Sequence, residues 1–272
     1  MKLAVLQMVS THHLDHNLAQ AQALLQQAAQ AGAELAVLPE YFCLMGHQDR
    51  DKLGIAEPFG HGPIQSFLAQ KARDLGLWVV AGTLPIVASE PGRVFNSSLV
   101  FNPQGQCVAR YDKIHLFRFD NGTEAYDEAR VLQRGTEPVH FDVPSRDGHT
   151  WRVGMSVCYD LRFPELYRHY AVHSADLLVV PSAFTHTTGQ AHWEVLLRAR
   201  AIENLAYVAA AAQGGVHTNG RRTWGHSLMI DPWGCVMDQL AEGAGVVVCD
   251  LDARALAQWR SQLPALQHRV LS

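Results

Sequence analysis

The stretch Val153-Gly154-Met155-Ser156-Val157-Cys158-Tyr159-Asp160-Leu161-Arg162-Phe163-Pro164-Glu165 changes character abruptly at its cysteine. An apolar run ends at Cys158, and a polar, helix-compatible stretch follows at once. This pattern predicts a buried strand that delivers the thiol to the rim of a sheet, where a helix begins. The partial positive charge of a helix N-terminus favours thiolate, and free N–H groups of the same turn can bind an oxyanion. The alternative is a structural cysteine, since a lone cysteine beside an apolar run is often a small buried hydrophobe.

Two more segments end in chemically useful side chains. The run Leu35-Ala36-Val37-Leu38-Pro39 leads to Glu40, and Lys113 stands just past an expected strand in Arg110-Tyr111-Asp112-Lys113. A thiolate, a carboxylate and an ammonium group are a complete set for acyl transfer: a nucleophile, a proton shuttle and an oxyanion partner. Taken singly, Glu40 could be a solvated loop carboxylate and Lys113 a surface charge.

The three segments together resemble the carbon–nitrogen hydrolase, or nitrilase, superfamily, whose members use a Glu-Lys-Cys triad. The resemblance extends from Lys2 to Arg269. It is closest to the deaminated glutathione amidase branch, through AHWEVLLRARAIEN at 191–204, AAAQGG at 210–215, and GHS at 225–227 leading to DPWG at 231–234.

The resemblance implies a role for each residue of the triad. Cys158 is the expected nucleophile, and Glu40 is the expected general base, which later protonates the leaving amine. Lys113 and the backbone N–H of Tyr159 are expected to stabilise the oxyanion. A second carboxylate is expected at Glu128, which would position the substrate or Lys113; Glu124 and Asp127 are fallback candidates. Covalent catalysis of this kind requires neither a metal nor an organic cofactor.

The branch resemblance also implies substrate contacts. Arg162, one turn past Cys158, is expected to bind a substrate carboxylate, although a structural salt bridge to Glu165 is an alternative. Phe184 and Thr188 are expected to line the pocket for a keto-acid end; plain loop packing is the alternative. Glu194 is expected to support the site from behind.

The expected function is hydrolysis of a linear amide that bears a 2-oxo acid, with deaminated glutathione, a metabolite-repair substrate, as the first candidate. An ω-amidase on 2-oxoglutaramate is the nearest alternative, and a non-catalytic binding protein on the same fold is a remote one. The family resemblance further implies a homodimer or larger homo-oligomer.

Composition agrees with a cytoplasmic enzyme. The chain has 272 residues and a net charge of −4, and no dense Lys/Arg cluster indicates nucleic acid. We see no signal peptide and no apolar run long enough to span a membrane.

The cysteines and histidines argue against disulfide and metal frameworks. Five scattered cysteines form no Cys-x-x-Cys pair, and Cys43 is a minor rival nucleophile because it lies near Glu40. His169 and His173 have helical spacing that could bind zinc, but no metalloprotease pattern surrounds them. His192 and His226 are candidates for hydrogen bonds to active-site loops.

Strands and helices alternate along the chain, which predicts a single α/β domain over residues 1–272. Strands are expected at 2–8, 35–38, 77–83, 95–101, 106–111, 138–142, 152–157, 177–180, 206–211, 226–230, 235–238 and 245–250. Helices are expected at 16–31, 63–75, 162–173, 189–204 and 253–263. Residues 114–137 lack periodicity and are expected to form a long loop over the site. The resemblance implies a four-layer α-β-β-α sandwich with mixed sheets.

Overall fold

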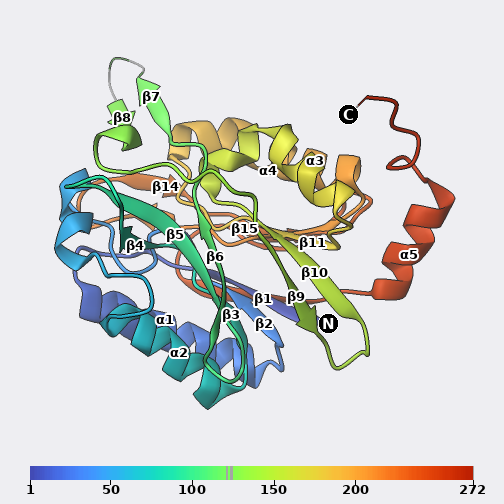
Figure 1. Cartoon of the computed structure of the whole chain (residues 1–272), viewed down its shortest axis with the longest axis horizontal. Coiled ribbons are helices and arrows are strands. Elements are labelled where there is room, and N and C mark those ends of the chain that lie inside the picture. Colours follow the sequence, from blue (N-terminus) through green and yellow to red (C-terminus); the bar gives the residue numbers. More distant parts are fainter. Residues whose placement is uncertain (121, 123–124, 272) are drawn as a thin grey trace.

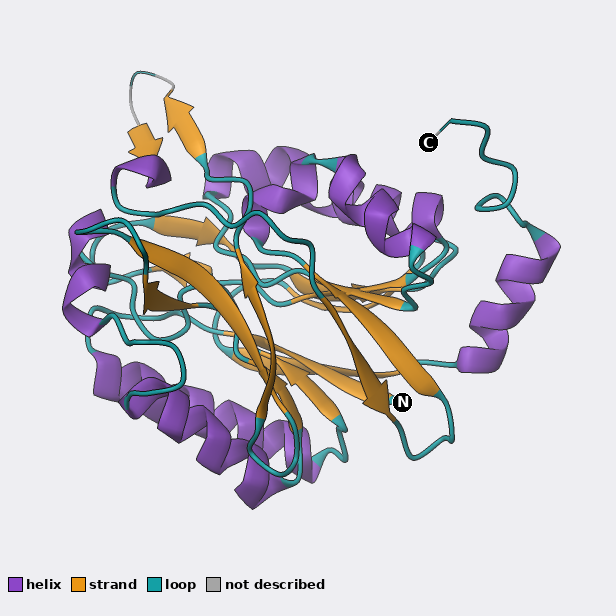
Figure 2. Ribbon diagram, in the orientation of Figure 1, coloured by secondary structure: helices purple, strands orange, loops and turns teal. Residues whose placement is uncertain are grey.

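The computed structural model describes residues 1–120, 122 and 125–271. Two mixed β-sheets face each other, and helices cover their outer faces, which gives four layers (Figure 1; Figure 2). This arrangement confirms the predicted α-β-β-α sandwich. Within the described residues, no helix has the length and apolar character needed to cross a membrane.

The first sheet contains seven strands and mixes parallel with antiparallel pairs. Its order is β17-β1-β2-β3-β5-β4, with β6 paired to β5. The strands are β1 (Lys2–Gln7), β2 (Leu35–Val37), β3 (Trp78–Val80), β4 (Leu84–Val87), β5 (Val94–Phe101), β6 (Cys107–Asp112) and β17 (Gly245–Asp250).

The second sheet contains six strands, and two short hairpins lie beside the sheets. The second sheet has the order β16-β15-β12-β11-β10-β9, and the hairpins pair β13 with β14 and β7 with β8. Their bounds are β7 (Arg118–Asp120), β8 (Ala125–Asp127), β9 (His140–Pro144), β10 (Thr150–Met155), β11 (Leu177–Val179), β12 (Tyr207–Ala210), β13 (Gly214–Val216), β14 (Arg222–Trp224), β15 (Ser227–Ile230) and β16 (Val236–Leu240).

Alternation along the central strands builds two cores. On β1, Leu3 and Val5 belong to the core between the sheets, whereas Ala4 and Leu6 pack toward the helices on the other face. Because successive strand side chains point to opposite faces, a strand buried on both faces is apolar throughout. This burial explains why the strand before Glu40 appears in the sequence as an unbroken apolar run.

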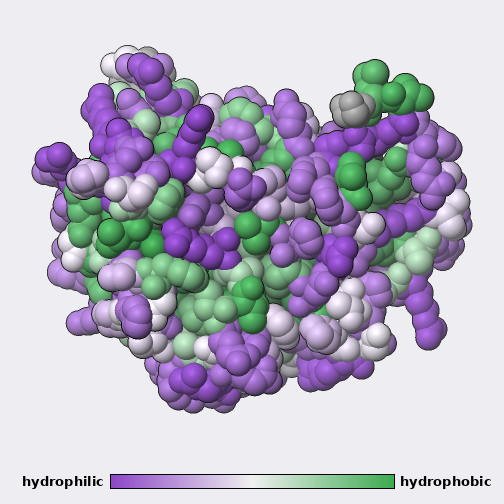
Figure 3. Space-filling view, in the orientation of Figure 1, coloured by the Kyte–Doolittle hydropathy of each residue, from purple (hydrophilic) through white to green (hydrophobic). Residues whose placement is uncertain are grey.

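Helices α1 (Leu14–Gln30) and α2 (Pro63–Leu75) cover the first sheet, and α3 (Pro164–Val172) and α4 (His186–Asn204) cover the second (Figure 1). Helix α5 (Ala253–Gln262) projects beyond the sheets, with Asp252 capping it as expected. The segment after α5 leaves Val270 and Leu271 exposed by 94% and 82%, and it forms an apolar projection in Figure 3.

Several local predictions need correction. Residues 114–137 contain the β7–β8 hairpin and the 3₁₀ turn η2 (Glu128–Arg130), so they are not a featureless loop. The helix expected at 162–173 divides into η3 (Cys158–Arg162) and α3, because Pro164 occupies the first turn of a new helix. Arg162 therefore ends η3 and does not lie inside an α-helix. The sequence analysis also missed β4, β13 and β14.

Candidate active site

Three chain segments that follow strands bring Glu40, Lys113 and Cys158 to one place. Glu40 follows β2, Lys113 follows β6, and Cys158 opens η3 three residues after β10 ends. Lys113 Nζ donates a hydrogen bond of 2.9 Å to Glu40 Oε1, and both side chains are almost fully buried. Glu40 and Cys158 line the same pocket, above the lysine. This burial excludes both alternatives, a solvated Glu40 and a surface Lys113.

Two neighbours fix the orientation of the Glu40 carboxylate. Asn96 Nδ2 donates to Oε1 at 2.9 Å, and the backbone N–H of Ala183 donates to Oε2 at 2.9 Å. With Lys113, three donors from separate elements hold the carboxylate. The group is therefore pre-oriented, which reduces the reorganisation needed during a proton transfer.

Glu128 supplies a second carboxylate beneath the site. Its two oxygens accept bonds of 3.0 and 2.8 Å from Lys113 Nζ, and Tyr41 Oη and the Phe117 N–H donate at 2.8 and 2.7 Å. Burial raises the pKa of Glu128, but Lys113 outweighs it and the net pKa is lowered. A carboxylate with this many partners is suited to holding Lys113 in place.

The fallback carboxylates do not replace Glu128. Asp127 caps η2 by accepting from the Ala129 N–H, and its oxygen lies 3.7 Å from Arg130, away from the pocket. Glu124 lies outside the described residues.

Lys113 remains charged despite its burial. Loss of solvent lowers the pKa of a buried amine, but the carboxylates of Glu128 and Glu40 outweigh that effect and raise the pKa of Lys113 above its ordinary value. The site therefore holds a fixed ammonium group between two carboxylates.

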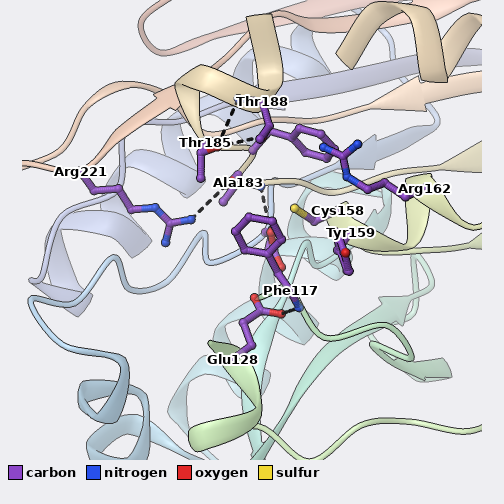
Figure 4. Close-up of a pocket in the computed structure, with 11 residues that line it drawn as sticks. Phe117, Glu128, Cys158, Tyr159, Arg162, Ala183, Thr185, Thr188 and Arg221 are labelled. Atoms are coloured by element: carbon purple, nitrogen blue, oxygen red, sulfur yellow. Dashed lines mark hydrogen bonds between the residues drawn. The ribbon is translucent and has the colours of Figure 1, made fainter. Parts of the chain in front are cut away.

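Cys158 sits in a strained turn that Asp160 anchors. Its φ of 51° is in the left-handed region, which costs a non-glycine residue about 1–3 kcal/mol. The Cys158 N–H donates to Pro181 O at 2.9 Å, and Asp160 Oδ2 accepts from the Val157 N–H at 2.9 Å and from Tyr111 Oη at 2.7 Å. These bonds hold the Sγ atom at the pocket (Figure 4).

The helix-start effect that favours thiolate does not dominate at Cys158. Burial and the Glu40 carboxylate raise the pKa of the Cys158 thiol well above its ordinary value, and Lys113 opposes them only in part. Cys158 starts a short 3₁₀ turn, so no long helix offsets the cost of burial. A thiol with a raised pKa needs a base to remove its proton before it can attack.

Cys43 does not rival Cys158. It belongs to the core between the first sheet and its helices, and burial raises the pKa of its thiol to about 12. It lies outside the pocket that Cys158 lines.

The pocket is a small hollow that is partly open to solvent. Every predicted substrate-binding residue lines it, as does Tyr159, whose backbone N–H is one of those that a helix start leaves without an intrahelical acceptor. No described carboxylate pairs with Arg162, so the alternative salt bridge to Glu165 is absent. The full lining is Glu40, Phe117, Glu128, Cys158, Tyr159, Arg162, Ala183, Phe184, Thr185, Thr188 and Arg221.

Sequence reasoning missed Asn96, Phe117, the Ala183 N–H and Arg221. Asn96 lies inside β5, Phe117 and Ala183 lie in loops, and Arg221 follows a turn, so no pattern marked them.

Other predicted residues lie elsewhere. Glu194 is half-exposed, lies 3.4 Å from Arg198 and does not reach the pocket, so its supporting role is not retained. His192 Nδ1 lies 3.2 Å from Arg162 Nη2, and His226 stacks on Trp224. Among the described residues, no group of three or more His, Cys, Asp or Glu side chains is arranged to hold a metal ion.

Comparison with known proteins defines the class. The carbon-nitrogen hydrolase family model matches residues 2–261, so the chain belongs to this family. The protein is a hydrolase of carbon–nitrogen bonds in linear amides. The family prediction from the sequence is confirmed.

The relatives narrow the likeness to one branch. A protein of Synechocystis named deaminated glutathione amidase is 41% identical over 270 residues, which cover 98% of this chain and 97% of the relative. The Caenorhabditis elegans NitFhit protein has a solved structure with a TM-score of 0.88 and 35% identity. The match covers 99% of this chain and 65% of that longer chain, which is under two thirds of its length.

A solved structure of an amidase variant from Nesterenkonia sp. AN1 bears on the reactivity of the active-site cysteine in a related protein. It is 26% identical, with a TM-score of 0.77, over 97% of this chain and 98% of that one. That structure shows the result of Michael addition of acrylamide at its active-site cysteine.

Proposed function

We propose that Cys158, Glu40 and Lys113 carry out amide hydrolysis through a thioester. Glu40 takes the thiol proton as Sγ attacks the amide carbonyl carbon, and Lys113 with the Tyr159 N–H stabilises the oxyanion. Glu40 then gives that proton to the leaving amine as the C–N bond breaks. In the second half-reaction Glu40 takes a proton from water, which attacks the thioester; the acid product leaves and the thiol is restored.

One observation carries this proposal: a buried ion pair of 2.9 Å joins Lys113 to Glu40, and Glu40 lines the same pocket as the buried Cys158 thiol, whose pKa is raised by burial. A thiol with a raised pKa is a poor nucleophile until a base removes its proton. The reactive cysteine in the Nesterenkonia relative supports the same role for Cys158. No step of this scheme requires a cofactor.

We propose deaminated glutathione as the substrate, with 2-oxoglutarate and cysteinylglycine as the products. The names of the relatives support this choice, and the carboxylate-free Arg162 beside Cys158 supports an acidic acyl group. Phe184 and Thr188 would line the acyl end. An ω-amidase acting on 2-oxoglutaramate is the second candidate, since that amide carries the same 2-oxo acid end.

The proposal extends to the assembly. We propose that residues 1–272 act as one catalytic domain, in the cytoplasm, and that two copies pair through α3 and α4. Val172 on α3 and Val195 and Ile202 on α4 are exposed by 59%, 69% and 48%. Val195 and Ile202 lie two turns apart on one helix face, so they offer exposed apolar side chains to a second copy.

Turnover tests the proposed function. Pure protein and its Cys158→Ala variant are incubated with deaminated glutathione and, separately, with 2-oxoglutaramate, and 2-oxoglutarate release is followed. Efficient turnover of the first, lost in the variant, is expected. Turnover of the second alone would move the protein to the ω-amidase reaction, and turnover of neither would overturn the substrate assignment.

A further inference from the structure

Arg221 is a second cation in the pocket, and the reaction scheme above does not use it. It follows the turn between β13 and β14, where its backbone N–H donates to Asn219 Oδ1 at 2.9 Å. Its guanidinium donates from Nη2 to Ala183 O at 3.2 Å, and its central carbon lies 5.2 Å from the centroid of the Tyr126 ring. These contacts hold the guanidinium at the pocket wall.

The charge of Arg221 is not matched by any described carboxylate. Its Nε atom is buried without a hydrogen-bond partner. A buried donor without an acceptor is costly, so a position of this kind is suited to a ligand that supplies acceptor oxygens. A carboxylate matches the planar fork of a guanidinium and can accept two of its N–H groups.

The neighbouring cations differ from Arg221 in their partners. Lys113 is neutralised by Glu40 and Glu128. Arg222, the next residue along the chain, is exposed and pairs with Glu242 at 3.5 Å. Arg162, like Arg221, lines the pocket without a described carboxylate. The pocket therefore presents two guanidinium groups that no carboxylate of the described residues pairs with.

The two guanidinium groups reach the pocket from opposite sides. In Figure 4, Arg162 enters from the side of Cys158 and Tyr159, Arg221 enters from the other side, and Ala183 lies between them. The Arg162 guanidinium lies 5.8 Å from the Phe184 ring, whereas that of Arg221 bonds to Ala183. A substrate that lies across Cys158 can meet one cation at each end.

We infer that Arg221 binds a carboxylate on the amine side of the scissile bond, while Arg162 binds one on the acyl side. The site thus selects amides with two carboxylates, one on each side of the bond that Cys158 attacks. This inference rests on the proposed amidase function and adds a residue that recognises a carboxylate on the leaving group. An amide whose leaving group is ammonia leaves Arg221 without a partner, which disfavours a simple ω-amidase substrate.

A cycle of substrate and protein changes tests this inference. The substrates are deaminated glutathione and the same molecule with its glycine carboxylate converted to a carboxamide. The protein variants are Arg221→Gln and, as a matched control, Arg222→Gln. We expect the unaltered protein to prefer the carboxylate roughly 10- to 100-fold in kcat/KM, mainly through KM, as for a charged hydrogen bond. In Arg221→Gln that preference should fall to about threefold or less. Arg221→Lys should restore part of the preference, and Arg222→Gln should leave it unchanged.

Several results would overturn the inference. One is an unaltered protein that treats the two substrates alike, a comparison that depends on no variant. Another is an equal loss of kcat/KM on both substrates in Arg221→Gln, which would show that Arg221 only supports Ala183 and Glu40. If Arg221→Gln keeps the full preference for the carboxylate substrate, Arg221 does not bind that carboxylate. Failure of the unaltered protein to hydrolyse either substrate would instead overturn the proposed function, and this inference would fall with it.

Discussion

Lys113 is the residue whose surroundings bear most on the energetics of the site. Its ammonium group is fully buried and bonds to both Glu40 and Glu128. Removing one member of a buried ionic network leaves the remaining charges unpaired and costs about 3–5 kcal/mol.

Lys113→Met is therefore expected to lower the free energy of unfolding by about 3–5 kcal/mol and to abolish turnover. Denaturant unfolding followed by circular dichroism measures the first effect. Adding Glu128→Gln to Lys113→Met should recover part of the stability, because one buried negative charge disappears. Lys71→Met, which removes a partly exposed lysine 3.7 Å from Asp74, is the control and should change stability by under about 1 kcal/mol. A similarly small change in Lys113→Met would contradict the account.

The raised pKa of Cys158 predicts its pH-dependent labelling. Because alkylation requires thiolate, the labelling rate should rise with pH, by about tenfold per unit, without levelling below pH 9. Exposed Cys107 and Cys235 are replaced by serine so that labelling reports on the site, and peptide mapping assigns the label. A plateau near pH 7 would show a resting thiolate and would remove the need for Glu40 as the base.

At the residue scale, the sequence identifies the chemistry but not its support. Glu40, Lys113 and Cys158 each follow a strand, so their positions can be read from local patterns. Asn96 and the Ala183 N–H hold Glu40 through contacts over 56 and 143 residues of chain, and no local pattern encodes such a contact. The raised pKa of Cys158 could not be predicted from the sequence, because burial is a property of the whole fold.

At the element scale, a glycine after β3 allows the Pro39–Glu40 segment, which follows β2, to pack closely against the backbone after β3. Gly82 has a φ of +48°, and a Cβ atom there would lie 2.0 Å from Pro39 O, next to Glu40. Only a residue without a side chain permits this approach of two backbones.

Gly82→Ala should displace the Pro39–Glu40 segment. We expect a loss of about 2 kcal/mol or more in stability and at least a tenfold loss in kcat, because a small misplacement of a catalytic group is costly. Gly92→Ala is the matched control, since Gly92 also has a positive φ, +74°, but has open space around its Cβ position. Equal effects of the two substitutions on kcat would refute the positioning argument.

Regular elements with strong apolar patterns were predicted well, and short polar ones were not. The helix at 63–75 was placed to the residue, because Pro63 starts it and Gly76 ends it in a left-handed conformation. The β5–β6 hairpin follows from the turn at 102–105. Strands β7, β8, β13 and β14 have three residues each, as do β2, β3 and β11, but they are not apolar throughout, so nothing in the sequence distinguishes them from loops.

At the scale of the whole molecule, the apolar face of α3 and α4 predicts association. Val195→Glu, which places a charge on that face, should shift the protein toward monomer in sedimentation velocity. Val87→Glu is the control, because Val87 is 51% exposed on β4, in the other sheet. Unchanged association of Val195→Glu would exclude this surface as the interface.

The strand order of the two sheets was beyond local analysis. The chain returns at its end to pair β17 with β1, across more than 200 residues, and β16 joins the second sheet beside β15. The alternation of strands and helices indicates the α/β class, whereas the layered arrangement came from the family resemblance. Physical reasoning on local patterns could not supply it, because pairing between distant strands depends on the packing of both sheets together.

The central claim is that an acyl group passes through Cys158. The most direct measurement is acid quenching of the protein during turnover of deaminated glutathione, followed by peptide mapping by mass spectrometry. The account predicts a 2-oxoglutaryl thioester on the peptide that contains Cys158, and neither adduct nor 2-oxoglutarate release in Cys158→Ala. Turnover that persists in Cys158→Ala, or an acyl group on another residue, would contradict it.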